Sequence, residues 1–314
     1  MQQSSNPMDA LNLSAEAERI ESLLVGAVDL HCHSGPSVMP RDLDHIEALQ
    51  QASAAGLRAV LFKDHYYSVT PTVRLLEKYY GDLNVTMLSG VPLNNTSGGL
   101  NKYAVEHGVL LGANLVWMPT FSAGNHIRHD HRHRSLATTT QLKPQALSIV
   151  DDMGVLKDDV KIILDQIATA DIVLSAGHSH ISEIWPLFEE AKARGVNRRL
   201  VQHPTFVVGA NLTDIGELAR DGAYIEHSIC MFDPASKYNF YDSETLKGLI
   251  KAGTIEKTIL GSDLGQIDNP MPVDGFRAVI KQCIELGHSD DEIRAMVGGN
   301  AARLVGLDKI EKRV

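Results

Sequence analysis

Short apolar runs alternate along this sequence with segments whose apolar residues recur at helical spacing. One helical segment follows residue 42 and carries Ile46, Leu49 and Ala52 on one face. Strands that alternate with helices are typical of a parallel sheet with helices packed outside it. Eight such units predict an α/β fold, a (β/α)8 TIM barrel rather than an open doubly wound sheet. The apolar runs that we interpret as buried strands lie at about 27–33, 57–63, 85–88, 113–118, 172–178, 200–203, 223–227 and 258–263.

The chain is long enough for one such barrel with additions. A barrel of this type takes roughly 250 residues, and no repeat or linker divides the sequence. We therefore expect an N-terminal tail and short helix over 1–25, with Ser14 as the helix cap, and a single barrel over 26–314 that ends in C-terminal helices. The alternation breaks at about 120–156, after the fourth strand, in a segment rich in His, Arg and Thr. We predict that this insertion is a lid, the alternative being a disordered loop.

The composition favours a cytoplasmic enzyme that acts on a small molecule. The formal net charge of −10 makes a general role in binding nucleic-acid phosphates unexpected. No apolar run approaches the roughly 20 residues that span a bilayer, and the N-terminus lacks the features of a secretory signal. Three widely spaced cysteines argue against a disulfide framework. A homo-oligomer is compatible with all of these features.

Side chains that can bind a metal stand where several predicted strands end. His31 and His33 end the first strand, and because side chains alternate along a strand, both project to the same side. Barrel proteins gather their functional groups at the carboxyl ends of the strands. A single histidine at such a place is ordinarily structural, but the combination predicts a metal site. The further members of the set are Lys63, His178, His203 and Asp263, on the second, fifth, sixth and eighth strands.

With these residues in place, the sequence resembles the amidohydrolase superfamily of metal-dependent hydrolases, from about residue 26 to 307. The resemblance also includes Ser262 before Asp263 and the closing stretch 299–304 (Gly-Asn-Ala-Ala-Arg-Leu). It implies that one divalent ion is bound by His31, His33 and Asp263. It further implies that a second ion is bound by His178 and His203. Nitrogen-rich ligands suit two Zn²⁺ ions, with Mn²⁺ as the alternative.

The residue that bridges the two ions departs from the commonest family pattern. The family often takes a carboxylated lysine or a glutamate from the fourth strand, and the segment 117–119 (Trp-Met-Pro) offers neither. We expect Lys63 to replace it as a carbamate formed with carbon dioxide, because a free ammonium beside two dications is strongly disfavoured. The alternative is that Lys63 is a neutral or substrate-pairing lysine in a one-metal site.

Other polar residues near the strand ends are candidates for substrate contact. His178 and His180 lie two residues apart, so either could be the ligand; His178 is favoured because it directly ends the apolar run. The basic cluster in the insertion suits an anionic substrate, with a carboxylate as the favoured group; a solvated loop or a subunit contact is the alternative. The predicted substrate-binding residues are Arg41, His65, Asn95, His180, His227, Arg128 and Arg132.

The resemblance implies a hydrolysis reaction at this site. An amide, cyclic amide, lactone or ester bond would be cleaved by a metal-bound hydroxide, with Asp263 as the catalytic group that accepts the water proton and delivers it to the leaving group. One alternative is a one-metal decarboxylase or hydratase of the same superfamily, and another is a non-catalytic metal-binding barrel. A phosphoesterase with a related barrel is disfavoured, because the expected aspartate motif is absent after His33.

Overall fold

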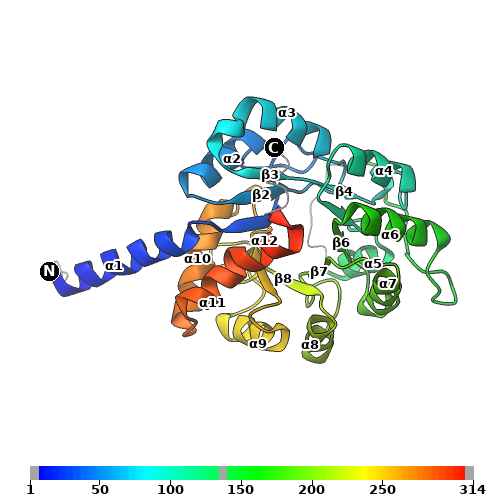
Figure 1. The fold of residues 1–314 in the computed structure, drawn as a ribbon. Helices are drawn as coiled ribbons and strands as arrows, with labels where there is room; N and C mark the ends of the chain where they lie inside the picture. The colour runs from blue at the N-terminus through cyan, green and yellow to red at the C-terminus, as the bar shows by residue number, and fades with distance from the viewer. Residues whose placement is uncertain (1–6, 134–139, 308–314) are drawn as a thin grey trace.

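The computed structural model describes the backbone of residues 7–133 and 140–307, and the side chains of residues 14–130 and 140–307. Strands and helices alternate along most of this length (Figure 1). The strands are β1 (Val28–Cys32), β2 (Ala59–Phe62), β3 (Thr86–Leu88), β4 (Gly90–Pro92), β5 (Leu115–Trp117), β6 (Val173–Ser175), β7 (Arg199–Gln202), β8 (Tyr224–Ser228) and β9 (Thr258–Gly261). The helices are α1 (Pro7–Leu24), α2 (His45–Ala54), α3 (Thr70–Tyr80), α4 (Lys102–Leu110), α5 (Gly124–His133), α6 (Asp158–Ala170), α7 (Ile181–Ala193), α8 (Leu212–Arg220), α9 (Ser243–Gly253), α10 (Pro272–Glu285), α11 (Asp290–Arg294) and α12 (Asn300–Val305).

All paired strands run parallel, in two sheets. The first sheet has the order β1-β2-β3 and the second the order β4-β5-β6-β7-β8-β9. Only Ser89 separates β3 from β4, so the predicted third strand continues past its expected end at residue 88. Beyond β9, the Asp263 amide donates to the carbonyl of His31 at 2.8 Å, which links the last strand to the first. This parallel α/β arrangement is consistent with the predicted TIM barrel, although the strand pairing forms two sheets and not one closed cylinder.

Gly90 is required where the third strand is interrupted. A Cβ atom at this position would lie 2.5 Å from the carbonyl oxygen of Leu115 and 2.5 Å from the Trp117 ring. Only a residue without a side chain lets the backbone of β4 approach β5 this closely. The glycine therefore makes room for the large indole in the interior.

An irregularity in β1 directs its histidines toward the interior. Val28 and Leu30 belong to an apolar cluster that takes residues from most of the strands, whereas Cys32 packs in the larger cluster on the helical side. The pairing of β1 with β2 shifts its register between Asp29 and Cys32. A bulge of this kind re-aims side chains, so both the apolar residues at the start of the strand and His31 at its end can face the interior.

The apolar cluster inside the strands is covered at one end by α12. Ala301, Leu304 and Val305 of this helix pack against the strand residues of the cluster. The apolar layer lies toward the amino ends of the strands, and the polar residues lie at their carboxyl ends. The cysteines Cys32, Cys230 and Cys283 are buried and unpaired.

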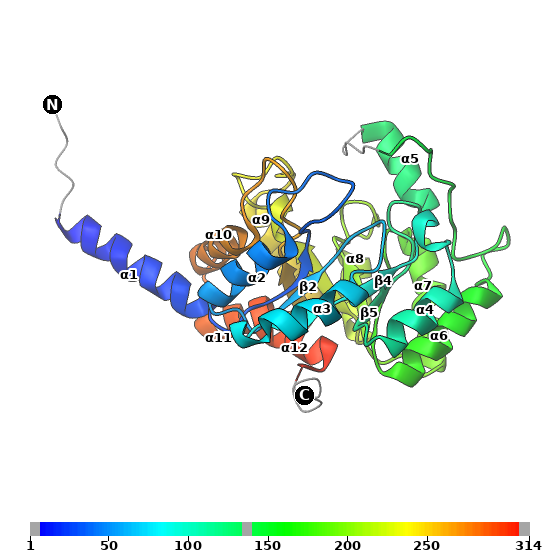
Figure 2. The ribbon, with the colours of Figure 1, turned by 90° about the horizontal axis from the view of Figure 1, so that it is seen from above.

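The N-terminal helix is longer than expected. We predicted a helix capped by Ser14, but α1 begins at Pro7, so that expectation is wrong. The helix projects from the body of the molecule in both ribbon views (Figures 1 and 2). Its C-terminal half is held by two ion pairs, Arg19 with Asp290 and Arg277 with Glu21, each at 2.6 Å.

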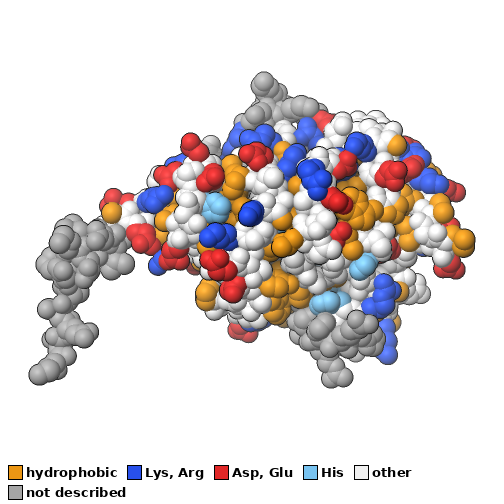
Figure 3. Space-filling model, turned by 90° about the horizontal axis from the view of Figure 1, so that it is seen from below, with side chains coloured by type: hydrophobic (Ala, Val, Ile, Leu, Met, Phe, Trp, Pro, Cys, Tyr) orange, Lys and Arg blue, Asp and Glu red, His pale blue; other side chains and the backbone are white. Residues whose placement is uncertain are grey.

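The insertion after β5 contains helix α5 and an extended return segment. Isolated bridges pair Ala123 with Leu147 and Val150 with Leu156. Residues 134–139 lie outside the described part of the chain. None of the described helices is long and apolar enough to cross a membrane. Figure 3 shows basic and acidic side chains interspersed over one face of the molecule.

Candidate metal centre

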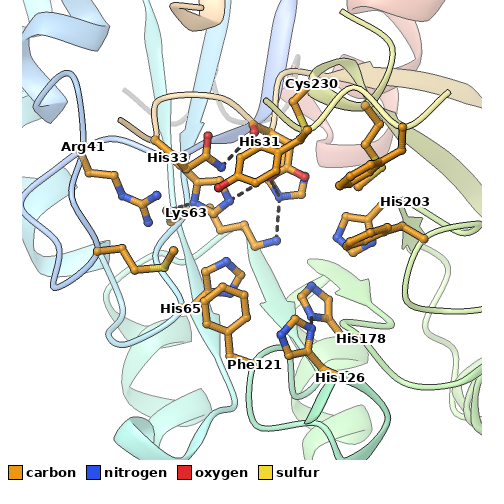
Figure 4. A pocket seen from close by; sticks show the side chains of 17 residues that line it. His31, His33, Arg41, Lys63, His65, Phe121, His126, His178, His203 and Cys230 are labelled. Carbon is orange, nitrogen blue, oxygen red and sulfur yellow. Dashed lines mark hydrogen bonds and ion pairs between the residues drawn. The ribbon is translucent and has the colours of Figure 1, made fainter. Parts of the chain in front are cut away.

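The six predicted metal-binding residues line one pocket at the carboxyl ends of the strands (Figure 4). They approach it from β1, from the ends of β2, β6 and β7, and from the segment after β9. All but Asp263 are buried, and its side chain is only 13% exposed. Residues up to 232 positions apart in the sequence therefore reach the same space. The six are His31, His33, Lys63, His178, His203 and Asp263.

His31, His33 and Asp263 form the tightest group of ligand atoms in this pocket. One atom from each residue lies within 4.8 Å of the other two. The Nε2 atoms of His31 and His33 lie 3.2 Å and 3.0 Å from the same oxygen, Oδ1 of Asp263. Two imidazole nitrogens and one carboxylate oxygen are a donor set that suits Zn²⁺ and other divalent transition metals.

Hydrogen bonds at the opposite ring nitrogens orient both histidines. The Nδ1–H of His33 donates to the carbonyl oxygen of Lys63 at 3.0 Å. A carbonyl can only accept, so in a neutral His33 the Nε2 atom carries a lone pair. Nδ1 of His31 lies 2.5 Å from Oε1 of Glu226, which leaves its Nε2 to face the pocket. Such partners at the far nitrogen are a regular feature of histidines that bind metals.

This arrangement needs a positive charge, either a proton on a histidine or a cation among the ligand atoms. In a protonated His33 the Nε2–H donates to Oδ1 of Asp263 at 3.0 Å, whereas in a neutral His33 a lone pair faces that anionic oxygen and the two repel. Burial lowers the pKa of His33, although the hydrogen bond and charge of Asp263 oppose this shift. A divalent cation between the three ligand atoms would remove the repulsion, so the residues present fit a metal ion.

The backbone holds Asp263 at a strained position. Its φ angle is +50°, and His203 has a φ of +33°. Both values lie in the left-handed region that residues other than glycine rarely adopt. Strain of this kind persists only where the surroundings enforce it and is often found at functional sites. Here the Ser262 hydroxyl and amide donate to the carboxylate of Asp29 at 2.5 Å and 3.0 Å, which fixes the turn.

The carboxylate of Asp263 is ionised at neutral pH. Burial acts to raise its pKa, but the charge of His31 and the hydrogen bond and charge of His33 outweigh burial and hold the pKa well below its usual range. The neighbouring Glu226 behaves in the opposite way. Burial raises the pKa of Glu226 to about 8, and the attraction of Lys63 only partly offsets this effect.

Lys63 reaches the centre of the group. Its Nζ lies 2.8 Å from Nε2 of His31 and 5.6 Å from the centre of the Trp117 ring. Lys63, which follows β2, therefore extends over the indole of Trp117 on β5. Burial lowers the pKa of Lys63 to about 8, although Asp263 and Glu226 oppose the shift.

His178 and His203 form a second group across the pocket. Their rings are 4.8 Å apart between centroids. Within the described part of the chain, Nε2 of His178 and Nδ1 of His203 are buried and have no hydrogen-bond partner. Nδ1 of His178 faces Nδ1 of His126, a residue of α5, at 2.9 Å. This pairing leaves Nε2 of His178 as the free nitrogen.

Two of the predicted substrate contacts lie in the pocket and three others do not. Arg41 and His65 line it. His180 accepts a hydrogen bond from the Ser182 amide, caps α7 and does not line the pocket, and its contact with substrate stays a prediction. His227 is buried away from the pocket lining, because Glu226 takes the interior position on β8. Asn95 accepts a hydrogen bond from the Gln145 amide and so anchors the return segment of the insertion.

The structure describes the side chain of one of the two arginines predicted to contact substrate from the insertion. Arg128 is exposed and does not line the pocket, so the structure gives it no contact there. The side chain of Arg132 lies outside the described residues, and its role stays a prediction. From the described part of the insertion, Phe121 and His126 line the pocket, and Nδ1 of His126 faces Nδ1 of His178.

Sequence reasoning missed several residues around the centre. Gln202 accepts from Trp117 at 2.8 Å and donates to Glu226 at 3.0 Å, so it connects the interior of three strands. The signal for Glu226 was a charged residue inside an apolar strand run, next to the histidine that we selected instead. The aromatic residues of the pocket, which are Phe121, Phe206, Tyr238 and Phe240, lie mostly in loops and gave no periodic signal.

The chain is similar to known proteins in sequence over one region and in fold over almost its whole length. The family of unknown function DUF6282 matches residues 26–226. No curated protein matches the sequence. An amidohydrolase from Pseudomonas aeruginosa has a TM-score of 0.61 at 13% identity, and the alignment covers 92% of this chain and 98% of that one.

Two further solved structures share the fold. The probable dipeptidase PvdM from Pseudomonas aeruginosa has a TM-score of 0.60 at 11% identity, with 98% of this chain and 100% of that chain covered. A protein named as a 2-pyrone-4,6-dicarboxylic acid hydrolase, from Pseudomonas putida, has a TM-score of 0.58 at 15% identity, with 90% and 98% covered. At these identities the likeness concerns the fold.

Proposed function

We propose that this chain, which belongs to the family of unknown function DUF6282 and shares the fold of solved amidohydrolases, is a metal-dependent hydrolase. Its substrate is a small anionic molecule, and the bond cleaved is an amide, cyclic amide, lactone or ester. The names of the similar structures, a dipeptidase and a pyrone dicarboxylic acid hydrolase, support these bond types. In this proposal the strands close as a barrel and residues 120–156 form its lid.

The observation that carries the proposal is the convergence of His31, His33 and Asp263. Two imidazole nitrogens face one carboxylate oxygen at 3.2 Å and 3.0 Å, and a divalent cation would hold the three ligand atoms together. We assign these three residues to one divalent ion, and His178 and His203 to a second. Zn²⁺ suits the nitrogen-rich set, and Mn²⁺ is the alternative.

When bound, a divalent ion supplies two effects: it lowers the pKa of a water molecule from about 16 toward 7, and it polarises a carbonyl group. The chain's own contribution is proton transfer and positioning. Asp263 is an ionised carboxylate at the pocket wall, so its oxygen can accept a proton and return it to the leaving group. Arg41 and His65 stand in the same pocket, where they can orient the substrate.

The test of this function is a panel of carboxylate-bearing amides, cyclic amides, lactones and esters, assayed with protein of measured metal content. Asp263→Asn keeps the shape of the side chain and removes the proton acceptor. We expect it to lower kcat at least 100-fold on any substrate that the wild type cleaves, because general acid–base catalysis contributes about 10²–10⁴-fold. Asp290→Asn, at a surface ion pair with Arg19, is the matched control and should retain activity. Equal rates in both variants would contradict the role of Asp263.

Lys63 is proposed to bridge the two ions as a carbamate. Its neutral amine would attack carbon dioxide, forming an N–C bond and releasing one proton, and the product would offer two anionic oxygens. The burial of Lys63 and its 2.8 Å approach to His31 support this assignment. Lys63→Ala should reduce the metal content from two ions to one per chain. Retention of two ions in this variant would exclude the bridge.

A one-metal decarboxylase or hydratase is the second candidate. It is favoured by one observation: among the residues that the structure describes, His31, His33 and Asp263 are the only metal-binding group of three. Metal analysis of the wild type separates the candidates, since this alternative requires one ion. Product analysis gives a second criterion, because decarboxylation releases carbon dioxide from the substrate without consuming water.

A further inference from the structure

We propose that the pocket binds a flat, conjugated ring that bears a carboxylate, with Arg41 as the residue that holds the carboxylate. This inference deepens the proposed function, because it names the substrate class of the same pocket. It stands on the side chains of the pocket wall and does not use the identity or number of the metal ions.

Arg41 is a buried cation with two donor nitrogens that lack a hydrogen-bond partner among the described residues. Its side chain is only 4% exposed, yet Nε and Nη2 have no hydrogen-bond partner among the described residues. The closest anion is Asp64, whose Oδ2 lies 3.7 Å from Nη2, too far for a hydrogen bond. In Figure 4 the guanidinium of Arg41 points into the pocket. A carboxylate can accept two parallel hydrogen bonds from this planar group and so satisfy it.

The position of Arg41 is fixed before any ligand arrives. Its backbone pairs with Gln266 in an antiparallel bridge, and the next amide, of Asp42, donates to the carbonyl of Gly265 at 3.0 Å. The loop after β1 is therefore fastened to the loop after β9, which carries Asp263. A ligand group held by Arg41 is consequently kept at a constant place relative to the candidate metal centre.

The remainder of the pocket wall is rich in aromatic rings. Phe121, Phe206, Tyr238 and Phe240 are four of the 17 lining residues, whereas aromatic residues make up 5% of the chain. The ring of Phe121 stacks on the ring of His65, with 3.6 Å between the ring centroids and an interplanar angle of 13°. Phe206 and Phe240 stack on each other at 5.1 Å and 9°.

These aromatic groups stand at two different parts of the wall. Phe121 lies beside His65, while Phe206 lies edge-on to His203, with ring centroids 6.5 Å apart. Figure 4 places His65 and His203 on different sides of the pocket. A planar conjugated ring can contact both groups through its faces and edges, an arrangement that aromatic pairs favour beyond the burial of apolar surface.

The charge of the wall selects a carboxylate over a phosphate ester. Apart from Arg41, the only Lys or Arg that lines the pocket among the described residues is Lys63. The Nζ of Lys63 already contacts His31 at 2.8 Å. One planar guanidinium matches the two oxygens and single charge of a carboxylate, whereas a dianionic phosphate would leave acceptors unpaired.

Binding of three probes to the metal-loaded protein tests the inference by calorimetry. Benzoate has both features, cyclohexanecarboxylate lacks the flat ring, and benzamide lacks the charge. We expect benzoate to bind at least tenfold more tightly than either of the others. Phe121→Leu should weaken benzoate at least threefold and leave cyclohexanecarboxylate unchanged.

Substitutions at Arg41 test the anchor. Arg41→Met should weaken benzoate at least tenfold, and Arg41→Lys should weaken it by a smaller factor. Arg199→Met is the matched control, because Arg199 is similarly buried, with 6% of its side chain exposed, but pairs with Asp221 outside the pocket. It should bind benzoate as the wild type does. If Arg41→Met fails to fold, Arg41→Lys and the comparison of benzoate with benzamide still decide the question.

Two results would overturn the inference. Unchanged benzoate affinity in Arg41→Met would mean that the carboxylate binds elsewhere, including directly to a metal ion. Equal affinity for benzoate and cyclohexanecarboxylate would mean that the pocket does not select a flat ring. Failure of the proposed function is recognised separately. If the protein binds benzoate through Arg41 but holds no metal and cleaves no member of the substrate panel, this inference stands and the proposed hydrolase function is wrong.

Discussion

Replacing Glu226 by glutamine is expected to weaken metal binding without unfolding the protein. Glu226 is fully buried and its Oε1 lies 2.5 Å from Nδ1 of His31 and 3.0 Å from Nε2 of Gln202. Burial favours the neutral form of Glu226 in the metal-free protein, but a divalent ion held by His31 favours the ionised form. Hydrogen bonds to a charged group contribute about 1.5–3 kcal/mol each. The carboxylate therefore fixes the ring of His31 so that Nε2 faces Asp263.

The magnitude follows from what glutamine keeps and loses. In Glu226→Gln an amide oxygen can still accept from His31, but the charge is gone and the NH₂ group replaces Oε2, which has no hydrogen-bond partner among the described residues. Loss of a partner at the far nitrogen of a metal-binding histidine weakens metal binding about 10–100-fold, which corresponds to about 1.4–2.7 kcal/mol. Glu226→Ala should bind metal more weakly still, because it removes the carboxylate from Nδ1 of His31 and from Nε2 of Gln202.

Competition with a chromophoric zinc chelator measures this affinity without any substrate, and circular dichroism verifies folding. Glu190→Gln, which removes a surface pairing with Arg194, is the control and should bind zinc as the wild type does. The reasoning is refuted if folded Glu226→Gln and Glu226→Ala both bind zinc within twofold of the wild type.

Three further predictions concern stability and the second group of histidines. Burial lowers the pKa of His227 to about 4 from 6.5, so below pH 6.5 the unfolded state binds a proton that the folded state does not, and stability decreases as the pH is lowered. Between pH 8 and pH 5 the free energy of unfolding of the wild type should therefore decrease by about 2 kcal/mol more than that of His227→Leu in urea titrations. Equal decreases would contradict this. Gly177 has φ +60°, and an added Cβ would lie 2.2 Å from the carbonyl oxygen of Met118; Gly177→Ala should be destabilised by about 2 kcal/mol or more in thermal unfolding, and a change within about 0.5 kcal/mol would argue against the clash. His126→Ala leaves Nδ1 of His178 unpaired, so binding of a second metal equivalent should weaken about tenfold while the first is unchanged; metal titration tests this, and equal weakening of both equivalents would count against two separate groups.

The order of strands along the chain was accessible from the sequence because each strand is a short apolar run, and six of the eight predicted runs end in a polar residue. His31, His33 and Asp263 could be identified for the same reason, since each follows such a run directly. Their coming together in one group of ligand atoms is the part of the predicted site that the structure brings out most directly.

The interior partners were hidden because these parallel strands are buried on both faces. An apolar run without alternation does not reveal which residues face inward, and at the end of β8 this ambiguity led us to His227 instead of Glu226. The capping of α7 by His180, which accepts from the Ser182 amide, was not expected because histidine is not among the usual N-cap residues. The continuation of the third strand into β4 was hidden by Gly90 and Pro92, which usually mark turns.

The fastening of the loop after β1 to the loop after β9 has a consequence for how such a protein can diversify. A substitution that moves Arg41 also moves Gln266, which pairs with it, and through Gln266 the nearby Asp263. The binding of a carboxylate by Arg41 and catalysis by Asp263, as proposed above, should therefore change together. Phe206 and Phe240 belong to other loops, where their amides donate to the carbonyls of His203 and Met231, so replacing their rings leaves the pairing of Arg41 with Gln266 unchanged. New specificities should therefore arise first as changes in the substrate ring that the pocket binds, while the requirement for a carboxylate on the substrate stays the same.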